Sequence, residues 1–528
     1  MHGRLKIRTS EEEKAKKEKE RQEKLKIFKH AMLKIQNKRK QGDLDTEQLD
    51  ITGQVLTNNP DIYTLWNIRR EILVEFRKTL TEEEITKIYD AELSLTEYCL
   101  KINPKSYCAW HQREWVLTTR ADPDWKKELG LCNTYLKLDE RNFHTWDYRR
   151  FVVSQCKPHM QEEFDYTTEK LLDNFSNYSA WHYRSKMLPE LYPDKEGGRP
   201  IQDNHYKHEL KMVLSAAFTD PDDTSAWFYQ RWLLGAVKTV IQVVVCTVSP
   251  MKSTVAFNHS VPLSYVKEKV KLFINDNVVN GEWISSVGNE YDDLWILKHN
   301  QDITHDLVIK MEHYIDDTEK EFISFCTYKS SYYVGKNKIC FQNKYSNTVL
   351  EELNEQLDAC RQLLVLEPDN KWTLLTTAFF LHCVDATTYH NEIINILETL
   401  LKIDKQRAGY YSDLISKWNL ERNIEENYDD SSLEYKVAFN RLTSLPHLQY
   451  YSFCESVDLS NQNLTARVLP TLIKLQHCKK LNLSNNKLVT LDGFPVLQLE
   501  ELNITGNNLS KNDVEQFRMK HKTMRIIF

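Results

Sequence analysis

The spacing of hydrophobic residues changes three times along this 528-residue chain. Residues 43–237 show helical spacing, much of 238–345 alternates with a period of two, 346–440 returns to helical spacing, and 441–528 carries leucines at short regular steps. Helical spacing predicts amphipathic helices, whereas a period of two predicts strands. The pattern therefore predicts a mainly α protein with an inserted β region and a distinct C-terminal region.

Five copies of one motif recur in residues 43–237. Each copy opens on Asn or Asp and places a Trp seven residues later, and the stretch between successive motifs is amphipathic, so each period predicts two helices. Such hairpins cannot bury their apolar faces alone and are expected to stack into an α-α superhelical solenoid. A sixth, degraded copy is "EPDNKWTLLTTAFFL" (367–381), with Leu374 in the Trp position. The five tryptophans are Trp66, Trp110, Trp146, Trp181 and Trp227, at steps of 44, 36, 35 and 46 residues.

The repeated positions are interpreted as structural, because they occur in every copy whereas a catalytic site occurs once. The opening Asn or Asp is expected to cap the following helix, and the aromatic residue at position five to pack back on the preceding helix. The Trp is expected to fill the space between hairpins. An Arg on the same helix face is expected to reach carbonyls or carboxylates of the next repeat. These arginines are Arg69, Arg113, Arg149 and Arg184.

The two non-helical regions have different signatures. Residues 238–345 contain short β-branched and aromatic runs such as "TVIQVVVCTV" and "STVAFNHSV", which predict an Ig-like β-sandwich of about seven strands. Residues 441–528 contain "SVDLSNQNLT", "KLNLSNNKLVTL" and "ELNITGNNLS", whose leucines recur at steps of 24 and 21 residues. This spacing predicts leucine-rich repeats, with short strands and Asn side chains bonded to the backbone.

Composition narrows the classes of function. The net charge is −6, which argues against a nucleic-acid-binding surface. The N-terminus is too charged for a signal peptide, and the most apolar stretch, 232–246, is too short to span a bilayer. Eleven scattered cysteines without a C-x-x-C pair indicate reduced thiols, so we expect a cytoplasmic protein. Residues 1–42 predict a charged, solvated N-terminal helix with one apolar stripe.

The repeat N-P-x-x-Y-x-x-W-x-x-R resembles that of protein prenyltransferase α subunits. Tetratricopeptide arrays share the hairpin but lack a Trp at this fixed offset. A β-sandwich inserted in the helices and a leucine-rich tail are similar to the branch of the family that modifies Rab GTPases, as are "MHGRLK" and "TLWNIRREIL". The α subunit of farnesyl and type I geranylgeranyl transferases lacks both additions.

The resemblance implies a subunit that is not active alone. Family enzymes are heterodimers whose β subunit holds zinc and the lipid substrate, here geranylgeranyl diphosphate, and zinc activates the cysteine thiolate of the protein substrate. Rab GTPases would be presented by a Rab escort protein. No Cys/His/Asp cluster with metal-ligand spacing occurs in this sequence, so no metal site is expected on this chain. Neither nucleic-acid binding nor direct membrane insertion is expected.

The resemblance also assigns candidate catalytic residues. Lys105 and Tyr107 in the "NPKSY" turn and His144 in "RNFHTW" match family positions that face the diphosphate, where they would stabilise the leaving group. Without the resemblance, Lys105 would be a solvated turn lysine and the other two would be packing groups. His2 could reach the zinc of the partner and block it, or it could be a plain surface residue.

Two alternatives remain open at this stage. The chain could be the α subunit of a farnesyl or type I geranylgeranyl transferase, which the two extra modules disfavour. It could also be a TPR-like non-enzymatic adaptor scaffold that uses the sandwich and the tail for binding. A scaffold would be stable alone, whereas a prenyltransferase α subunit would copurify with a β subunit.

Overall fold

The structure is a computed structural model that describes residues 11–194, 200–237, 240–315, 320–324, 327–329, 331–338, 340–427, 432–439 and 441–528. The chain divides into two compact units, Met1–Leu191 and Tyr192–Phe528. Each unit is described by itself.

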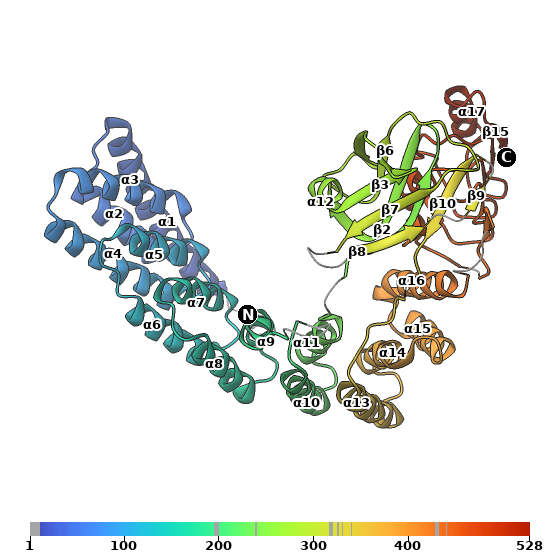
Figure 1. Cartoon of the computed structure of the whole chain (residues 1–528). Helices are drawn as coiled ribbons and strands as arrows, with labels where there is room; N and C mark the ends of the chain where they lie inside the picture. Colours follow the sequence, from blue (N-terminus) through green and yellow to red (C-terminus); the bar gives the residue numbers. More distant parts are fainter. Residues whose placement is uncertain are drawn as a thin grey trace. The chain divides into compact units, whose positions relative to one another are not determined.

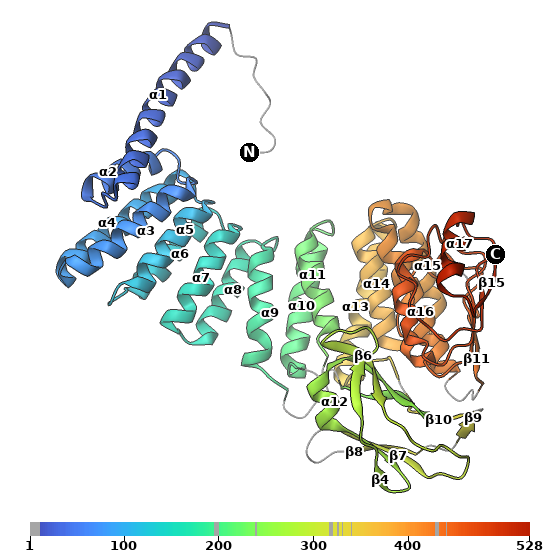
Figure 2. The ribbon, with the colours of Figure 1, turned by 90° about the horizontal axis from the view of Figure 1, so that it is seen from above.

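Unit 1 is a row of helical hairpins. Helices α2 and α3, α4 and α5, α6 and α7, and α8 and α9 pack as consecutive pairs, and α1 packs on α2. The second helices of successive pairs lie side by side, while α1 extends beyond the row (Figures 1 and 2). The helices are α1 (Glu11–Gln41), α2 (Thr46–Leu56), α3 (Tyr63–Thr79), α4 (Glu82–Ile102), α5 (Tyr107–Thr119), α6 (Trp125–Leu138), α7 (Phe143–Cys156), α8 (Met160–Asp173) and α9 (Tyr178–Leu191).

The turns before α5, α7 and α9 each use two polar residues rather than one. Asn103 ends α4, and its Oδ1 accepts the backbone N–H of Lys105 at 3.1 Å. The N-cap of α5 is Ser106, whose hydroxyl accepts the N–H of Ala109. The opening Asn therefore makes an Asx turn after the preceding helix instead of capping the next one. The same division of roles recurs at Asp139, where the N-cap is Asn142.

Unit 2 begins with further helical pairs that continue across the β insertion. Helix α10 packs on α13 and α11 on α14, although more than one hundred residues separate α11 from α13. Tyr411 lies seven residues after Asp404, is fully buried, and donates its hydroxyl to that carboxylate at 2.9 Å. It marks a seventh copy of the repeat, within residues 346–440, where the sequence predicted that the helical repeats continue. The helices are α10 (Asp203–Thr219), α11 (Thr224–Gly235), α13 (Asn347–Leu366), α14 (Lys371–Asp385), α15 (His390–Ile403) and α16 (Ala408–Glu426), with the 3₁₀ turn η1 (Lys405–Arg407).

The insertion forms two antiparallel sheets that face each other. One has the strand order β5-β6-β2-β1-β10-β9 and the other β4-β3-β7-β8. Phe257 and Trp295 of the first sheet share one buried core with Leu272 and Met311 of the second. The described segments contain ten strands rather than about seven, because strands of two or three residues are too short to detect by pattern. They are β1 (Val243–Val248), β2 (Lys252–Pro262), β3 (Val270–Ile274), β4 (Asn277–Val278), β5 (Glu282–Ser285), β6 (Tyr291–Lys298), β7 (Ile309–Tyr314), β8 (Lys320–Ser324), β9 (Thr327–Lys329) and β10 (Tyr332–Lys336), with helix α12 (Leu263–Lys269) after β2.

The C-terminal region is a ladder of five short parallel strands in the order β11-β12-β13-β14-β15. Asn486 donates to the Leu459 carbonyl at 2.9 Å and accepts from the Leu464 N–H, and Asn507 repeats this arrangement one step later. The sheet starts before the predicted boundary at residue 441. Its first strand, β11, has three residues and is too short to detect by pattern. The elements are β11 (Glu434–Lys436), η2 (Leu448–Tyr451), β12 (Ser456–Asp458), η3 (Ala466–Lys474), β13 (Lys480–Asn482), β14 (Glu501–Asn503), α17 (Lys511–Lys520) and β15 (Arg525–Ile527).

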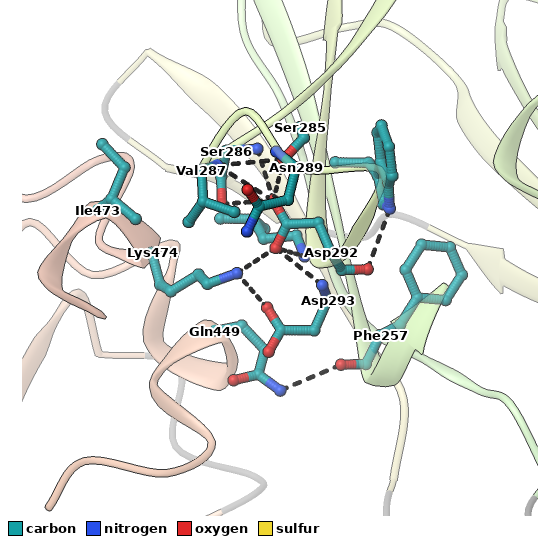
Figure 3. A network of polar contacts seen from close by, with 12 residues as sticks. Phe257, Ser285, Ser286, Val287, Asn289, Asp292, Asp293, Gln449, Ile473 and Lys474 are labelled. Atoms are coloured by element: carbon teal, nitrogen blue, oxygen red, sulfur yellow. Dashed lines mark hydrogen bonds and ion pairs between the residues drawn. The ribbon is translucent and has the colours of Figure 1, made fainter. Parts of the chain in front are cut away.

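A buried polar seam joins the sandwich to this parallel ladder. Lys474, at the end of η3, points between Asp292 and Asp293 of β6 and pairs with both carboxylates (Figure 3). Beside it, the Gln449 amide donates to the Phe257 carbonyl at 3.1 Å. Only 1% of the Asp292 side chain and 12% of the Lys474 side chain are exposed. The seam links the two β regions within unit 2, and removing Lys474 alone would leave the buried Asp292 carboxylate without its counterion.

Candidate functional site

The repeated tryptophans anchor each turn to the helix that follows it. In all five hairpins the indole N–H donates to the backbone carbonyl six residues earlier, for example from Trp110 to Pro104 at 3.0 Å and from Trp146 to Glu140 at 2.8 Å. This bond holds the turn on the helix end, so the turn side chains have defined positions. The set is Trp66, Trp110, Trp146, Trp181 and Trp227, none of them more than 5% exposed.

Three arginines of the motif, Arg69, Arg113 and Arg149, each reach a buried glutamate on the following helix of the stack. Arg113 of α5 donates two bonds to Glu128 of α6, at 2.7 and 2.6 Å, and Tyr148 of α7 donates to the same carboxylate at 2.8 Å. Arg113 and Glu128 are each 2% exposed. The pair therefore links consecutive hairpins through a bidentate ion pair inside the core.

The same arrangement recurs along unit 1. Arg69 pairs with Glu92, and Arg149 pairs with Glu163 at 2.9 and 2.6 Å. The arginines were expected to find such partners, but the glutamates were missed. A glutamate in an amphipathic helix has the sequence appearance of a surface residue. The feature that could have identified these glutamates is their fixed position on the apolar face of the first helix of each hairpin.

The network changes at the hairpin before the β insertion. This hairpin carries Gln230 in the arginine position. The carboxylate that follows, Glu352 of α13, pairs instead with Lys211 of α10 at 3.3 Å. A lysine from the neighbouring helix thus replaces the arginine charge at this step.

The structure brings Lys105, Tyr107 and His144 together. The rings of Tyr107 and His144 meet edge to face with centroids 4.3 Å apart, and Phe143 stacks on His144 at 4.0 Å. The Lys105 ammonium lies 3.7 Å from Asp139, and 63% of its side chain is exposed. All three residues come from the turns that start α5 and α7. They form a small polar cluster with one cation free to move.

His144 is set up as a neutral ring. It is 7% exposed, and burial lowers its pKa, with Lys105 acting in the same direction and Asp147 opposing it. A neutral imidazole carries one N–H donor and one acceptor nitrogen. The cluster therefore offers an ammonium, a phenol and an imidazole, which are donors suited to anionic oxygens.

The cluster lies within an exposed apolar edge. The aromatic residue that starts each second helix was expected to pack on the preceding helix, but Tyr107 is 66% exposed. At the first helical position the side chain projects off the end of the stack. Three apolar residues at or near the ends of the first helices are exposed as well. The edge consists of Tyr63, Tyr107, Phe143 and Tyr178 with Ile102, Leu138 and Leu172, all at least 50% exposed.

The described residues contain no group of three or more His, Cys, Asp or Glu side chains that could hold a metal ion. Among the thiols, burial raises the pKa of Cys99 and of Cys132 to about 12, so neither is a ready nucleophile. None of the helices in the described ranges is long and apolar enough to cross a membrane. His2 lies outside the described residues.

Comparison with known proteins agrees with this repeat architecture. The protein prenyltransferase alpha subunit repeat matches residues 45–76, 89–120, 125–156, 160–191 and 206–237. Geranylgeranyl transferase type-2 subunit alpha of Sus scrofa is 36% identical over 529 residues, covering 98% of this chain and 93% of its own length. The Homo sapiens protein of the same name is 36% identical with the same coverage, and that of Dictyostelium discoideum is 37% identical over 242 residues, 46% of this chain and 76% of its own.

Among solved structures, one chain of Candida albicans protein geranylgeranyltransferase-I complexed with GGPP covers 74% of this chain and 89% of its own length. The sequence identity is 16% and the TM-score is 0.42, a similarity too low to support an argument.

Proposed function

Because this chain belongs to the family of geranylgeranyl transferase type-2 α subunits, we propose that it is the α subunit of a Rab geranylgeranyltransferase. The enzyme would transfer geranylgeranyl groups from geranylgeranyl diphosphate to C-terminal cysteines of Rab GTPases presented by an escort protein. The observation that carries the proposal is identity along nearly the whole chain, which includes the β insertion and the parallel ladder as well as the helical repeats.

A β subunit is the partner that this function requires. The exposed edge of Tyr63, Tyr107, Phe143 and Tyr178 supports such a partner, because a row of large apolar side chains facing water is typical of a protein interface. The hairpin turns fix these rings at one position of every repeat. We propose that the β subunit covers this edge and so encloses the Lys105 cluster.

Zinc would be held by the β subunit, since the described residues of this chain provide no set of ligands that fits it. When bound there, zinc would lower the pKa of the cysteine thiol of the protein substrate and so favour the nucleophilic thiolate. The role of this chain lies at the other end of the reaction. As the sulfur bonds to C1 of the geranylgeranyl group, the C1–O bond breaks and negative charge grows on the departing diphosphate.

Lys105, Tyr107 and His144 would stabilise that charge. The Lys105 ammonium is exposed and held only by a 3.7 Å contact to Asp139, so it can move to a diphosphate oxygen. The Tyr107 hydroxyl and the neutral His144 imidazole can each donate one hydrogen bond. Donors that act on charge formed in the transition state raise the rate of the chemical step rather than substrate affinity alone.

The test is single-turnover transfer by the heterodimer co-expressed with a type-2 β subunit. We expect Lys105→Ala to slow the chemical step about tenfold or more while the complex stays intact. Lys101→Ala is the matched control, because Lys101 is an equally exposed lysine, paired with Glu97 at 3.2 Å, on the helix before the turn. Equal rates for Lys105→Ala and Lys101→Ala would remove Lys105 from the mechanism.

Substrate choice tests the class of enzyme. The proposal expects transfer to Rab proteins with C-terminal cysteines only when escort protein is present. Transfer to C-a-a-X peptides without escort would instead indicate a farnesyl or type I subunit. No transfer with any substrate, together with a stable monomeric chain, would indicate an adaptor.

A further inference from the structure

Two buried asparagines tie the turns of neighbouring hairpins together in unit 1. The Asn142 amide at the start of α7 donates to the Pro104 carbonyl at 3.1 Å, and the Asn177 amide before α9 donates to the Glu140 carbonyl at 2.8 Å. Each acceptor is a backbone carbonyl in the turn of the preceding hairpin. Each link therefore fixes where one turn lies relative to the next.

The acceptor of each link is also held from its own side. The Pro104 carbonyl accepts the Trp110 indole N–H at 3.0 Å, and the Glu140 carbonyl accepts that of Trp146 at 2.8 Å. A single carbonyl thus receives one bond from its own hairpin and one from the following hairpin. The first bond holds the turn on its helix, and the second sets its distance to the next turn.

Asn142 joins the two parts of the Lys105 cluster. Its Nδ2 reaches the Pro104 carbonyl, in the turn that carries Lys105 and Tyr107. Its Oδ1 accepts the backbone N–H of His144 at 3.1 Å. One planar amide, 2% exposed, therefore connects the turn that starts α5 with the first residues of α7.

The other contacts across this cluster impose less geometry. The rings of Tyr107 and His144 meet edge to face at 4.3 Å, a contact without a fixed hydrogen-bond direction. The pair of Lys105 with Asp139 is 3.7 Å long and exposed, and such pairs contribute little energy. Hydrogen bonds require both a distance and a direction, so the two bonds of Asn142 restrain the cluster more tightly than these contacts do.

We propose that Asn142 is a positioning residue for the Lys105 cluster. It holds Lys105 and Tyr107 at a fixed separation from His144, so that all three side chains can act on one diphosphate. The inference rests on the proposed function, since that function supplies the diphosphate. Asn142 is buried and acts only through these neighbours. Donors that are already in place need no rearrangement as charge develops, and a small displacement of such groups slows the reaction.

Asn142→Gly removes the link without adding charge. Glycine is tolerated at an N-cap with a small loss of stability, so the heterodimer with a type-2 β subunit should still assemble. Single-turnover transfer to an escort-bound Rab protein should slow about tenfold. The KM for geranylgeranyl diphosphate should stay unchanged, because the displaced donors act on charge that forms in the transition state.

Asn142→Asp is a second variant with a secure helix start. Asp is among the preferred N-cap residues and accepts the same backbone N–H, but it has no donor for the Pro104 carbonyl. It should slow transfer at least as much as Asn142→Gly. This variant keeps the proposal testable if the glycine variant fails to assemble.

Asn142→Ser should restore the link. Ser106 occupies the same position one hairpin earlier, where its hydroxyl donates to the Pro60 carbonyl at 3.4 Å and accepts the Ala109 N–H at 3.3 Å. A serine side chain can therefore make both bonds, and this variant should recover most of the wild-type rate.

Asn177→Gly is the matched control. Asn177 is fully buried and makes the same two kinds of bond, to the Glu140 carbonyl and from the Ala180 N–H at 3.1 Å. Its link joins two turns that do not separate Lys105 from His144. The unfolding midpoint should fall by a similar amount to that of Asn142→Gly, while the single-turnover rate should stay that of the wild type.

NMR of the heterodimer with ¹³C-labelled histidine measures the geometry directly. The His144 ring signals, assigned with His144→Gln, should shift in Asn142→Gly because the Tyr107 ring has moved, and they should stay unchanged in Asn177→Gly. A wild-type rate or unshifted His144 signals in both Asn142→Gly and Asn142→Asp would overturn the inference. So would an Asn142→Ser rate as low as that of Asn142→Gly, or equal slowing by Asn177→Gly. Absence of transfer by the wild-type heterodimer would instead overturn the proposed function.

Discussion

The helical repeats of unit 1 and the parallel ladder at the C-terminus solve one problem in two ways. Both stack short units that cannot bury an apolar face alone, and both place recurring polar side chains in the core. In the helical repeats they include charged pairs, as in Arg113 with Glu128. In the ladder they include neutral amides, as in Asn486, which bonds to backbone groups.

The difference determines what each region tolerates. An ion pair satisfies two side chains from different helices, so removing one partner leaves the other charge buried and alone. An amide that bonds to the backbone serves carbonyls and N–H groups that cannot be removed by substitution. We therefore expect the helical repeats to be sensitive to single changes and tolerant of paired ones, whereas the ladder has no compensating second substitution.

The largest expected effect is on the charged core. Arg113→Met should lower the free energy of unfolding of unit 1 by about 3–5 kcal/mol, because Glu128 is 2% exposed and keeps its charge. The measurement is urea unfolding followed by the helical circular dichroism signal.

The double variant Arg113→Met, Glu128→Leu sharpens the comparison. It should recover most of the lost stability, since a well-packed apolar pair costs little relative to a buried ion pair. The Tyr148 hydroxyl then lacks its acceptor, so the double variant should remain about 1 kcal/mol less stable than the wild type. A double variant no more stable than Arg113→Met would contradict this account of the core.

The effect on the neutral ladder should be smaller and confined to the tail. Asn486→Leu leaves the Leu464 N–H and the Leu459 carbonyl without partners, at an expected cost of about 2–3 kcal/mol. Amide hydrogen exchange across residues 456–509 measures the loss locally. Asn486→Gln is the control and should cost less than half as much, because Gln462 bridges backbone groups at the preceding rung.

The sequence predicted these regions unevenly, for physical reasons. Trp110 is identifiable because a rare, large residue recurs at a fixed offset, and burial follows from its size. Glu128 is not identifiable in the same way, since its burial depends on an arginine from another helix. Tyr107 was placed wrongly for a related reason: its exposure is set by the end of the stack, which the period does not encode. Fold class came from periodicity, but the role of the Lys105 cluster came from resemblance.

Arg231 of α11 shows the same limit. Its position four residues after Trp227 matches that of Arg70, and only the assembled helices show that Arg70 reaches Gln112 of α5, whereas Nε and Nη2 of Arg231 have no hydrogen-bond partner among the described residues. Pairing of buried charges is a property of neighbouring chain segments. Spacing along one segment therefore predicts where a charge stands, and not whether it is satisfied.

The smallest expected effect is a loss of stability in acid, and it distinguishes the ladder from its junction with the sandwich. His477 stacks on Tyr332 with centroids 4.1 Å apart and bonds to Thr247 at 2.9 Å. Burial, with Lys252 and Lys479, lowers its pKa to about 3. The unfolded chain binds a proton near pH 6.5 and the folded chain does not, so the stabilising contribution is present above that pH and lost as pH falls.

Between pH 6.5 and 5, where few carboxylates titrate, unit 2 should lose about 1–2 kcal/mol through His477. His477→Gln keeps a donor for Thr247 and should reduce this pH dependence without abolishing it, since burial also lowers the pKa of His299 and of His390 in unit 2. Asn486→Gln should leave the slope unchanged because an amide does not titrate. Unfolding midpoints of the wild type and both variants at the two pH values provide the measurement. If His477→Gln keeps the slope of the wild type, the junction histidine is not the acid-sensitive group, and the contrast between a titrating junction and a neutral ladder fails.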